Sequence, residues 1–171
     1  REIGFLRFML RFHKRVSIER AVSGPGIGNL YRYVIDSGII PSEQVAKEVA
    51  AGGDVPEIVS RHTLVGDCPT SAETMDIFLN LFGAEAGNLA LKILPTGGVY
   101  VAGGVAAKNL ELLRRGAFMT AYGDKGRLSA LVRSSPSKPC AMPAKPSATR
   151  ALSSAVVPVR ASSDRARYSS A

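Results

Sequence analysis

The chain has 171 residues, a formal net charge of +8 and 46% hydrophobic residues. This is enough chain for one modest globular domain. No apolar run reaches the roughly 18 residues that a membrane-spanning helix needs, so we expect no membrane partner. The charge is uneven, because residues 134–171 hold six basic residues and one acidic residue, which leaves +3 for residues 1–133. A body that is only mildly basic does not favour nucleic acid as a partner.

The cysteines and histidines show no metal-binding pattern. Cys68 and Cys140 are far apart, which is typical of a reducing compartment rather than of a disulfide framework. His13 and His62 also lack the spacing of metal ligands. We therefore assign no metal site to this chain and expect each histidine to be solvated or part of the core.

Amphipathic helices dominate the first part of the chain. Over residues 2–13 an aromatic stripe recurs at helical spacing and predicts a buried face, formed by Phe5, Phe8, Met9 and Phe12. Ser23 or Gly24 caps a second helix, with Pro25 in its first turn and Gly38 after its end. Two short polar helices follow, over about residues 43–51 and 55–64.

Glu19 stands among apolar residues just before the second helix. A carboxylate in such surroundings needs partners if it is buried. One interpretation is an ion pair with Arg15 or Arg20. Another is a ligand site, because an ionised glutamate accepts hydrogen bonds through two oxygens, which suits two adjacent sugar hydroxyls. The residues alone favour the ion pair.

The longest helical pattern covers residues 71–94, and Thr70 with Glu73 predicts a capping box at its start. The positions expected to be buried are Met75, Phe78, Leu79, Phe82, Ala86, Leu89, Ala90 and Ile93. Gly83 and Gly87 lie inside this helix, where each glycine costs about 1 kcal/mol relative to alanine. They predict close approach of another backbone, most simply a strand, or of a ligand near Gly87.

A short strand over residues 98–102 has a glycine pair at each end, and a helix over 105–115 follows. A strand, a Gly-Gly turn and a helix start make a place for a phosphate or ribose. The alternative is a tight turn without a ligand. Residues 128–132 read as another strand or a short helix. This order of elements predicts an α/β fold.

Residues 134–171 are rich in Ser, Ala, Pro and basic side chains and show no helical or strand period. Such a segment cannot bury enough apolar surface to offset the entropy lost on ordering. We therefore predict a disordered basic tail, separate from a domain over residues 1–133.

Several separated motifs together resemble bacterial-type glucokinase over about residues 1–133. In chain order they are 16–26, 29–32, 87–91, 97–104 and 124–127. The resemblance implies that the γ-phosphoryl group of ATP is transferred, with Mg²⁺, to the 6-hydroxyl of glucose at the entry to glycolysis. It implies an α/β, ribonuclease H-like ATPase fold of the actin/hexokinase type. This chain would be a large-lobe fragment of it, helix-rich with a short core sheet. A homodimer in the cytoplasm is expected, or a plastid location if a transit peptide preceded the chain.

By this resemblance Glu19 is the glutamate that hydrogen-bonds glucose, which reverses the preference for an ion pair. Gly103 and Gly104 match the pair that the nucleotide approaches. The family's catalytic aspartate, first phosphate loop and Glu-x-x-His motif precede the matching stretch, so no catalytic residue is assigned here and we expect negligible kinase activity from this chain alone. A non-catalytic sugar-binding or interaction module is the alternative. For the tail our hypothesis is a shifted reading frame or a retained intron.

Overall fold

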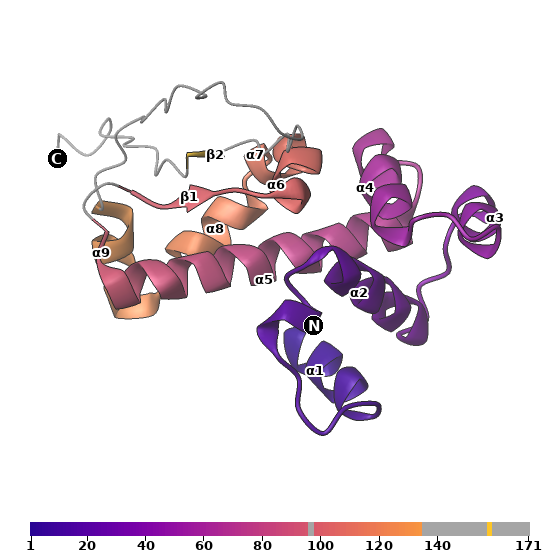
Figure 1. Cartoon of the computed structure of the whole chain (residues 1–171), viewed down its shortest axis with the longest axis horizontal. Helices are drawn as coiled ribbons and strands as arrows, with labels where there is room; N and C mark the ends of the chain where they lie inside the picture. The colour runs from indigo at the N-terminus through magenta and orange to yellow at the C-terminus, as the bar shows by residue number, and fades with distance from the viewer. Residues whose placement is uncertain (96–97, 135–156, 159–171) are drawn as a thin grey trace, which may run out of the picture.

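One long helix, α5, organises the chain, and the other elements pack on it or on its neighbours (Figure 1). The computed structural model describes residues 1–95, 98–134 and 157–158. The elements up to the long helix are α1 (Glu2–Leu10), η1 (Ile18–Arg20), α2 (Gly24–Asp36), α3 (Glu43–Ala50), α4 (Val55–Val65) and α5 (Pro69–Ile93). After it come β1 (Tyr100–Val101), α6 (Gly104–Lys108), α7 (Leu110–Arg114), α8 (Ala117–Gly123), η2 (Gly126–Leu128), α9 (Ser129–Ser134) and β2 (Val157–Pro158).

The core lies where α5 meets its neighbours on two sides. Helices α1 and α2 lie on one side of α5, and β1, α6, α7 and α8 lie on the other (Figure 1). Many of the largest fully buried side chains come from α1, α2 and α5, namely Met9, Ile27, Leu30, Met75, Ile77 and Phe78, and α3, α4 and α7 add Val45, His62 and Leu112. In the described residues no helix combines the length and the apolarity that crossing a membrane requires.

The predicted capping box at the start of α5 is wrong. The helix begins earlier than expected, at Pro69, whose missing N–H suits the first helical position. Cys68 is therefore the N-cap residue, and Thr70 already lies inside the helix. The Thr70 hydroxyl donates to the carbonyl of Ile39 at 3.3 Å, and Glu73 instead accepts from the Arg1 guanidinium at 3.0 Å.

Three positions of the predicted apolar stripes are exposed. Helix α1 ends at Leu10, so Phe12 leaves the buried face and is 62% exposed, although its ring still contacts Phe8 edge-on at 5.3 Å. On α5, Leu89 and Ile93 are 49% and 61% exposed. Helical period selects a face of the helix, but neighbouring elements decide how far along the helix that face is covered.

The interior glycines of α5 do mark close approach of another backbone, but the partner is a helix and not the predicted strand. A Cβ added at Gly83 would collide with the carbonyl of Phe118, and one at Gly87 would collide with that of Tyr122. Both carbonyls belong to α8. The Lys125 ammonium, just beyond α8, donates to the carbonyl of Ala84 at 2.8 Å and holds the two helices together.

Strand β1 is shorter than expected and only half buried. Val101 is 6% exposed and Tyr100 is 39% exposed. The strand pairs antiparallel with β2, so that Tyr100 lies opposite Pro158 and Val101 opposite Val157. Residues 157–158 fall in the segment predicted to be disordered and form a strand there; the prediction for residues 135–156 and 159–171 lies outside the described residues. The ribonuclease H-like fold stays a prediction.

The helix predicted over residues 105–115 is divided in two at Asn109. This residue has φ −114° and ψ 22°, which ends α6 and begins α7. Residues 128–132, which the sequence leaves between strand and helix, belong mainly to helix α9. Together α6 to α9 form the layer that carries the second glycine pair.

Candidate functional site

The loop that carries Glu19 is fixed by the start of α2. Ser23 is the N-cap residue, which confirms one of the two predicted caps. Its hydroxyl oxygen accepts from the backbone N–H of Gly26 at 2.9 Å and donates to the carbonyl of Glu19 at 2.6 Å. One side chain therefore closes the helix start and ties it to the backbone of η1.

Other residues of the same motif hold this backbone from the opposite side. The Asn29 amide donates to the carbonyl of Arg20 at 2.8 Å. Gly26 packs directly on the backbone of Ala21, where an added Cβ would collide with the Ala21 carbonyl. The spacing of Ser, Gly and Asn in the motif thus reflects the contacts that fix the shape of the loop before α2.

The carboxylate of Glu19 is exposed. In the part of the chain that the structure describes, the ion pairs do not include Glu19, and Arg20 instead contacts the ring nitrogen Nε2 of His13 at 3.2 Å. The proposed pairing with Arg15 or Arg20 is therefore absent from the structure. A solvent-facing carboxylate on a rigid loop is available to a ligand.

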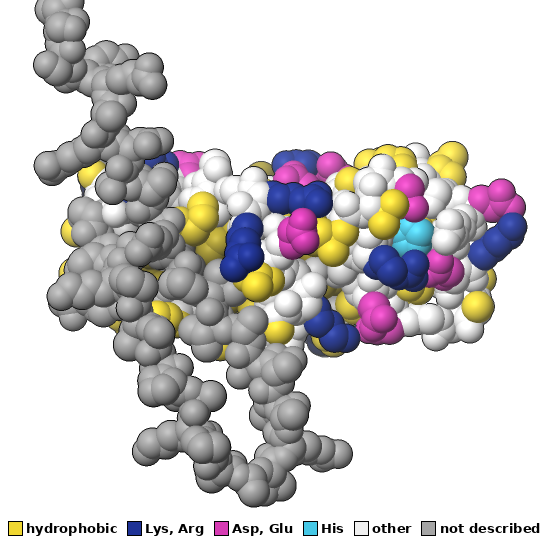
Figure 2. All heavy atoms as spheres, turned by 90° about the horizontal axis from the view of Figure 1, so that it is seen from above, with side chains coloured by type: hydrophobic (Ala, Val, Ile, Leu, Met, Phe, Trp, Pro, Cys, Tyr) yellow, Lys and Arg dark blue, Asp and Glu magenta, His cyan; other side chains and the backbone are white. Residues whose placement is uncertain are grey.

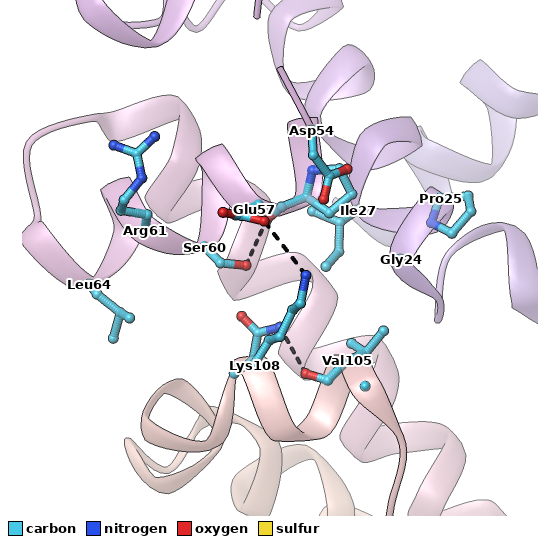
Figure 3. A pocket seen from close by; sticks show the side chains of 13 residues that line it. Gly24, Pro25, Ile27, Asp54, Glu57, Ser60, Arg61, Leu64, Val105 and Lys108 are labelled. Atoms are coloured by element: carbon cyan, nitrogen blue, oxygen red, sulfur yellow. Dashed lines mark hydrogen bonds and ion pairs between the residues drawn. The ribbon is translucent and has the colours of Figure 1, made fainter. Parts of the chain in front are cut away.

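A cleft of about 760 Å³ lies between α2 and α4 on one side and α6 on the other. The side chains of this cleft come from all three helices (Figure 3). Its lining residues are Gly24, Pro25, Ile27, Asp54, Pro56, Glu57, Ser60, Arg61, Leu64, Gly104, Val105, Lys108 and Asn109. A concave space of this size, with apolar walls and a few charged groups, is typical of a small-molecule site.

The cleft joins two motifs that are far apart in the sequence. Gly24 and Pro25 directly follow the Ser23 cap, and Gly104 belongs to the second glycine pair. A Cβ added at Gly24 would lie 3.9 Å from Cγ2 of Val105. The structure therefore brings Gly104 beside the motif that carries Glu19, whereas Glu19 and Gly103 are not among the lining residues.

The second glycine pair combines two different requirements. Gly103 has φ +105°, a backbone conformation that side chains disfavour. Gly104 is the first residue of α6, and an added Cβ there would meet no described atom within 4 Å. The packing of the described residues thus does not require a glycine at position 104, and the space beside it opens on the cleft.

One pair of oppositely charged side chains spans the cleft. The Lys108 ammonium lies 3.6 Å from the carboxylate of Glu57, and the dashed line in Figure 3 shows this pair spanning the space between α6 and α4. Arg61 pairs with Glu48 on α3, so the carboxylate of Glu48 balances its positive charge. Acidic and basic side chains also lie next to one another on the face of the molecule seen in Figure 2.

His62 is a core histidine, as expected, and is 2% exposed. Its Nδ1 lies 2.7 Å from Asp67 and its Nε2 lies 3.4 Å from Glu48.

Cys68 is a free, buried thiol. Burial acts to raise the pKa of this thiol, but hydrogen bonds from the backbone N–H groups of Ser42 and Ser71 act against it, and the pKa is lowered to about 7.

Sequence reasoning missed the α4 side of the cleft and Asn109. The two helices over residues 43–51 and 55–64 are short and polar, and no motif in them indicated a site. In the structure α4 supplies Glu57, Ser60 and Leu64 to the cleft. Their i, i+3, i+7 spacing on one helix face is the signal that could have grouped them, although it does not say what they face.

The geometry shows a cleft lined by residues of two glycine-bearing motifs, and the comparisons give the family. The sequence profile described as Glucokinase matches residues 1–145, so the chain belongs to this family. The glucokinase of Synechocystis sp. is 39% identical over 135 residues, which are 71% of this chain and 38% of that protein. The glucokinase of Trichormus variabilis is 36% identical over 148 residues, 79% of this chain and 43% of that protein.

The glucokinase of Psychromonas ingrahamii is 38% identical over 112 residues, 66% of this chain and 32% of that protein. The chain thus spans less than half the length of these relatives. Membership of the family follows from the match, whereas the activity of a whole protein does not follow from a part of it.

Proposed function

We propose that the protein to which this chain belongs is a glucokinase, which transfers the γ-phosphoryl group of ATP to the 6-hydroxyl of glucose. In this proposal Glu19 binds glucose, and Gly103 and Gly104 form part of the nucleotide site. The observation that carries it is the cleft that joins Gly24 and Pro25, just after the Glu19 loop, with Gly104. Sugar and nucleotide motifs must meet in this way if one substrate is to attack the other.

The cleft fits a nucleotide in size and in chemistry. Its volume of about 760 Å³ lies within the range of roughly 300–1,000 Å³ that is common for ligand sites. Ile27, Leu64 and Val105 give it apolar walls. Gly104 leaves room for close approach of a ligand, since no described atom occupies the place of its missing Cβ.

In the proposed reaction a bond forms between the sugar O6 and the γ-phosphorus. The bond from that phosphorus to the bridging oxygen of ADP breaks, and the hydroxyl proton passes to a base. Such transfers depend mainly on positioning and on stabilising charge. Glu19 serves positioning, because an ionised carboxylate only accepts hydrogen bonds and can hold two sugar hydroxyls. The resemblance assigns the base to the part of the family sequence that precedes the matching stretch.

Mg²⁺ belongs to this proposal as a companion of ATP. Magnesium in such sites is bound largely by phosphate oxygens and water. The described residues contain no group of three or more His, Cys, Asp or Glu that could hold a metal ion. A ribonuclease H-like fold of two lobes is proposed with the activity and is supported by membership of the family. The homodimer and the cytoplasmic location stay predictions.

Isothermal titration of the purified chain with glucose tests the sugar site. We expect Glu19→Gln to weaken glucose binding about ten-fold or more, because a charge-assisted acceptor is lost. Glu111→Gln, on an exposed face of α7, is the control and should bind glucose as the unaltered chain does. Equal affinities for all three proteins would contradict the role of Glu19.

A coupled assay for glucose 6-phosphate tests the expectation about activity. We expect no product from the chain alone, because no base for the sugar hydroxyl is assigned to it. Product formation would show that this chain itself includes a base. Binding of glucose without any binding of ATP would favour the alternative of a non-catalytic sugar-binding module.

A further inference from the structure

We propose that Asn109 recognises the 6-amino group of adenine and makes this site selective for ATP over 6-oxopurine nucleotides. The inference rests on the proposed function, because it needs a nucleotide in the cleft. It adds a residue that neither the motifs nor the glycine pairs indicate.

The position of the Glu19 loop fixes the direction of the nucleotide. The γ-phosphate must point toward the sugar, and the sugar site lies beyond Ser23, at the end of the cleft lined by Gly24 and Gly104. The base must therefore occupy the other end. There the cleft is lined by Ser60 and Leu64 from α4 and by Asn109 at the junction of α6 and α7.

Asn109 is a buried polar side chain whose amide oxygen lacks a hydrogen-bond partner within the described ranges. It is 3% exposed, and its Oδ1 is one of the buried oxygens among the described residues that have no hydrogen-bond partner. The others are the hydroxyls of Ser42 and Ser71, which lie beside the Cys68 thiol away from the cleft. Only Asn109 among these three also lines the cleft.

The orientation of the Asn109 amide is set by its own helix. Its backbone N–H donates to the carbonyl of Val105 at 3.1 Å, and its Nδ2 donates to the same carbonyl at 2.9 Å. Turning the amide over would place Oδ1 against a carbonyl oxygen, which repels it. The amide nitrogen therefore stays on Val105, and Oδ1 stays free as an acceptor.

A free buried acceptor is unfavourable until a donor reaches it. Adenine carries an amino group at position 6, which is a donor. Hypoxanthine and guanine carry an oxygen there, so two acceptors would face each other. A site built to hydrogen-bond one substituent rejects the analogue that lacks it, because the polar group of the site is left unpaired.

The ion pair between Lys108 and Glu57 spans the cleft near this end (Figure 3). Oδ1 of Asn109 is closed to solvent in the structure, so a base reaches it only after neighbouring side chains move. Lys108 directly precedes Asn109, and its bond to Glu57 is long, at 3.6 Å, between side chains that are 65% and 64% exposed. Such exposed pairs contribute little to stability, so this one opens readily.

The test compares ATP with ITP, which differs from ATP by an oxygen in place of the 6-amino group. Binding of each, with magnesium, is measured by isothermal titration of the full chain. We expect the unaltered chain to prefer ATP about ten-fold, as for one well-placed hydrogen bond. Asn109→Leu should lower ATP affinity about ten-fold, leave ITP affinity nearly unchanged and so abolish the preference.

Asn80→Leu is the matched control. The Asn80 amide makes the same kind of bond to the carbonyl four residues earlier, at 2.7 Å to Asp76, but it lies on α5 outside the cleft. This variant should keep the preference for ATP. Asn109→Ser, which retains an acceptor in a smaller side chain, checks the result if Asn109→Leu does not fold, and it should keep part of the preference.

The outcomes separate the inference from the proposed function. Equal binding of ATP and ITP by the unaltered chain would overturn the role of Asn109 and leave the nucleotide site standing. A preference that survives in Asn109→Leu would overturn it as well. Failure of the unaltered chain to bind either nucleotide would overturn both the nucleotide site and the selectivity proposed for it.

Discussion

Gly24 and Val105 lie side by side across the cleft, where a Cβ on Gly24 would come within 3.9 Å of Cγ2 of Val105. One residue begins α2 and the other belongs to the first turn of α6. Their contact sets the distance between the loop that carries Glu19 and the second glycine pair. Any change that separates the two helix starts will therefore alter both halves of the proposed site together.

Gly104→Val is expected to impair ligand binding without affecting the fold. No described atom lies within 4 Å of the added Cβ, so the free energy of unfolding should change by no more than about 0.5 kcal/mol. The valine side chain would instead occupy space that opens on the cleft, and we expect ATP affinity to fall about ten-fold or more. Titration with ATP and thermal unfolding of the same protein measure the two effects.

Gly103→Ala is expected to lower the stability of the fold, which Gly104→Val should leave nearly unchanged. Its backbone has φ +105°, and strain of this kind costs on the order of 1–3 kcal/mol. The added methyl group itself meets no described atom within 4 Å. If Gly104→Val binds ATP as tightly as the unaltered chain, the cleft at position 104 is not the nucleotide site.

The sequence predicted most helices because each carries its own apolar period and its own start and stop residues. Helix α2 is an example, since Ser23, Pro25 and Gly38 mark it locally. The capping box predicted at Thr70 is wrong for two reasons. Pro69 starts the helix before Thr70, and the Thr70 hydroxyl donates to the carbonyl of Ile39 instead of capping the helix. The hydrogen bond between Thr70 and Ile39 is a tertiary contact, so the local sequence pattern could not predict it.

Less of the candidate site than of the fold could be predicted from the sequence. The motifs indicate Glu19 and Gly104, and the roles of both residues stay proposals. Asn109 looked like one more position of a single helix over residues 105–115. Its burial, the break between α6 and α7 and its unpaired oxygen depend on how α6 packs, which period and composition do not encode.

Gly87→Ala is expected to destabilise the protein by about 1–3 kcal/mol, the usual range for overpacking. The added methyl group would collide with the Tyr122 carbonyl, so α5 and α8 would have to separate. Gly28→Ala is the matched control, because Gly28 also lies inside a helix but has no atom within 4 Å of an added Cβ.

At Gly28 the helix propensity of alanine should dominate and raise the free energy of unfolding by about 0.5–1 kcal/mol. Chemical denaturation of both variants measures the pair of effects, which have opposite signs. Equal stabilities of Gly87→Ala and the unaltered chain would contradict the close packing of α5 on α8.

The ion pair between Glu48 and Arg61 is expected to make stability depend on acidic pH. The hydrogen bond from Arg61 holds the pKa of the Glu48 carboxyl below its ordinary value of 4.5. A carboxyl with a lowered pKa in the folded state stabilises the protein above its unfolded-state pKa and loses this contribution as the pH falls through the folded-state pKa. Glu48→Gln removes the titrating group, so the unaltered chain should be the more stable of the two at pH 7.

This difference in unfolding temperature should shrink as the pH falls below 4.5, because the protonated Glu48 no longer pairs with Arg61. Glu43→Gln is the control on the same helix. The partner of Glu43 is Lys47, and the two side chains are 83% and 74% exposed, so solvent screens their attraction and stability should change little at either pH. A difference between Glu48→Gln and the unaltered chain that stays constant from pH 7 to acidic pH would show that Glu48 acts through packing or through its contact with His62 rather than through its charge.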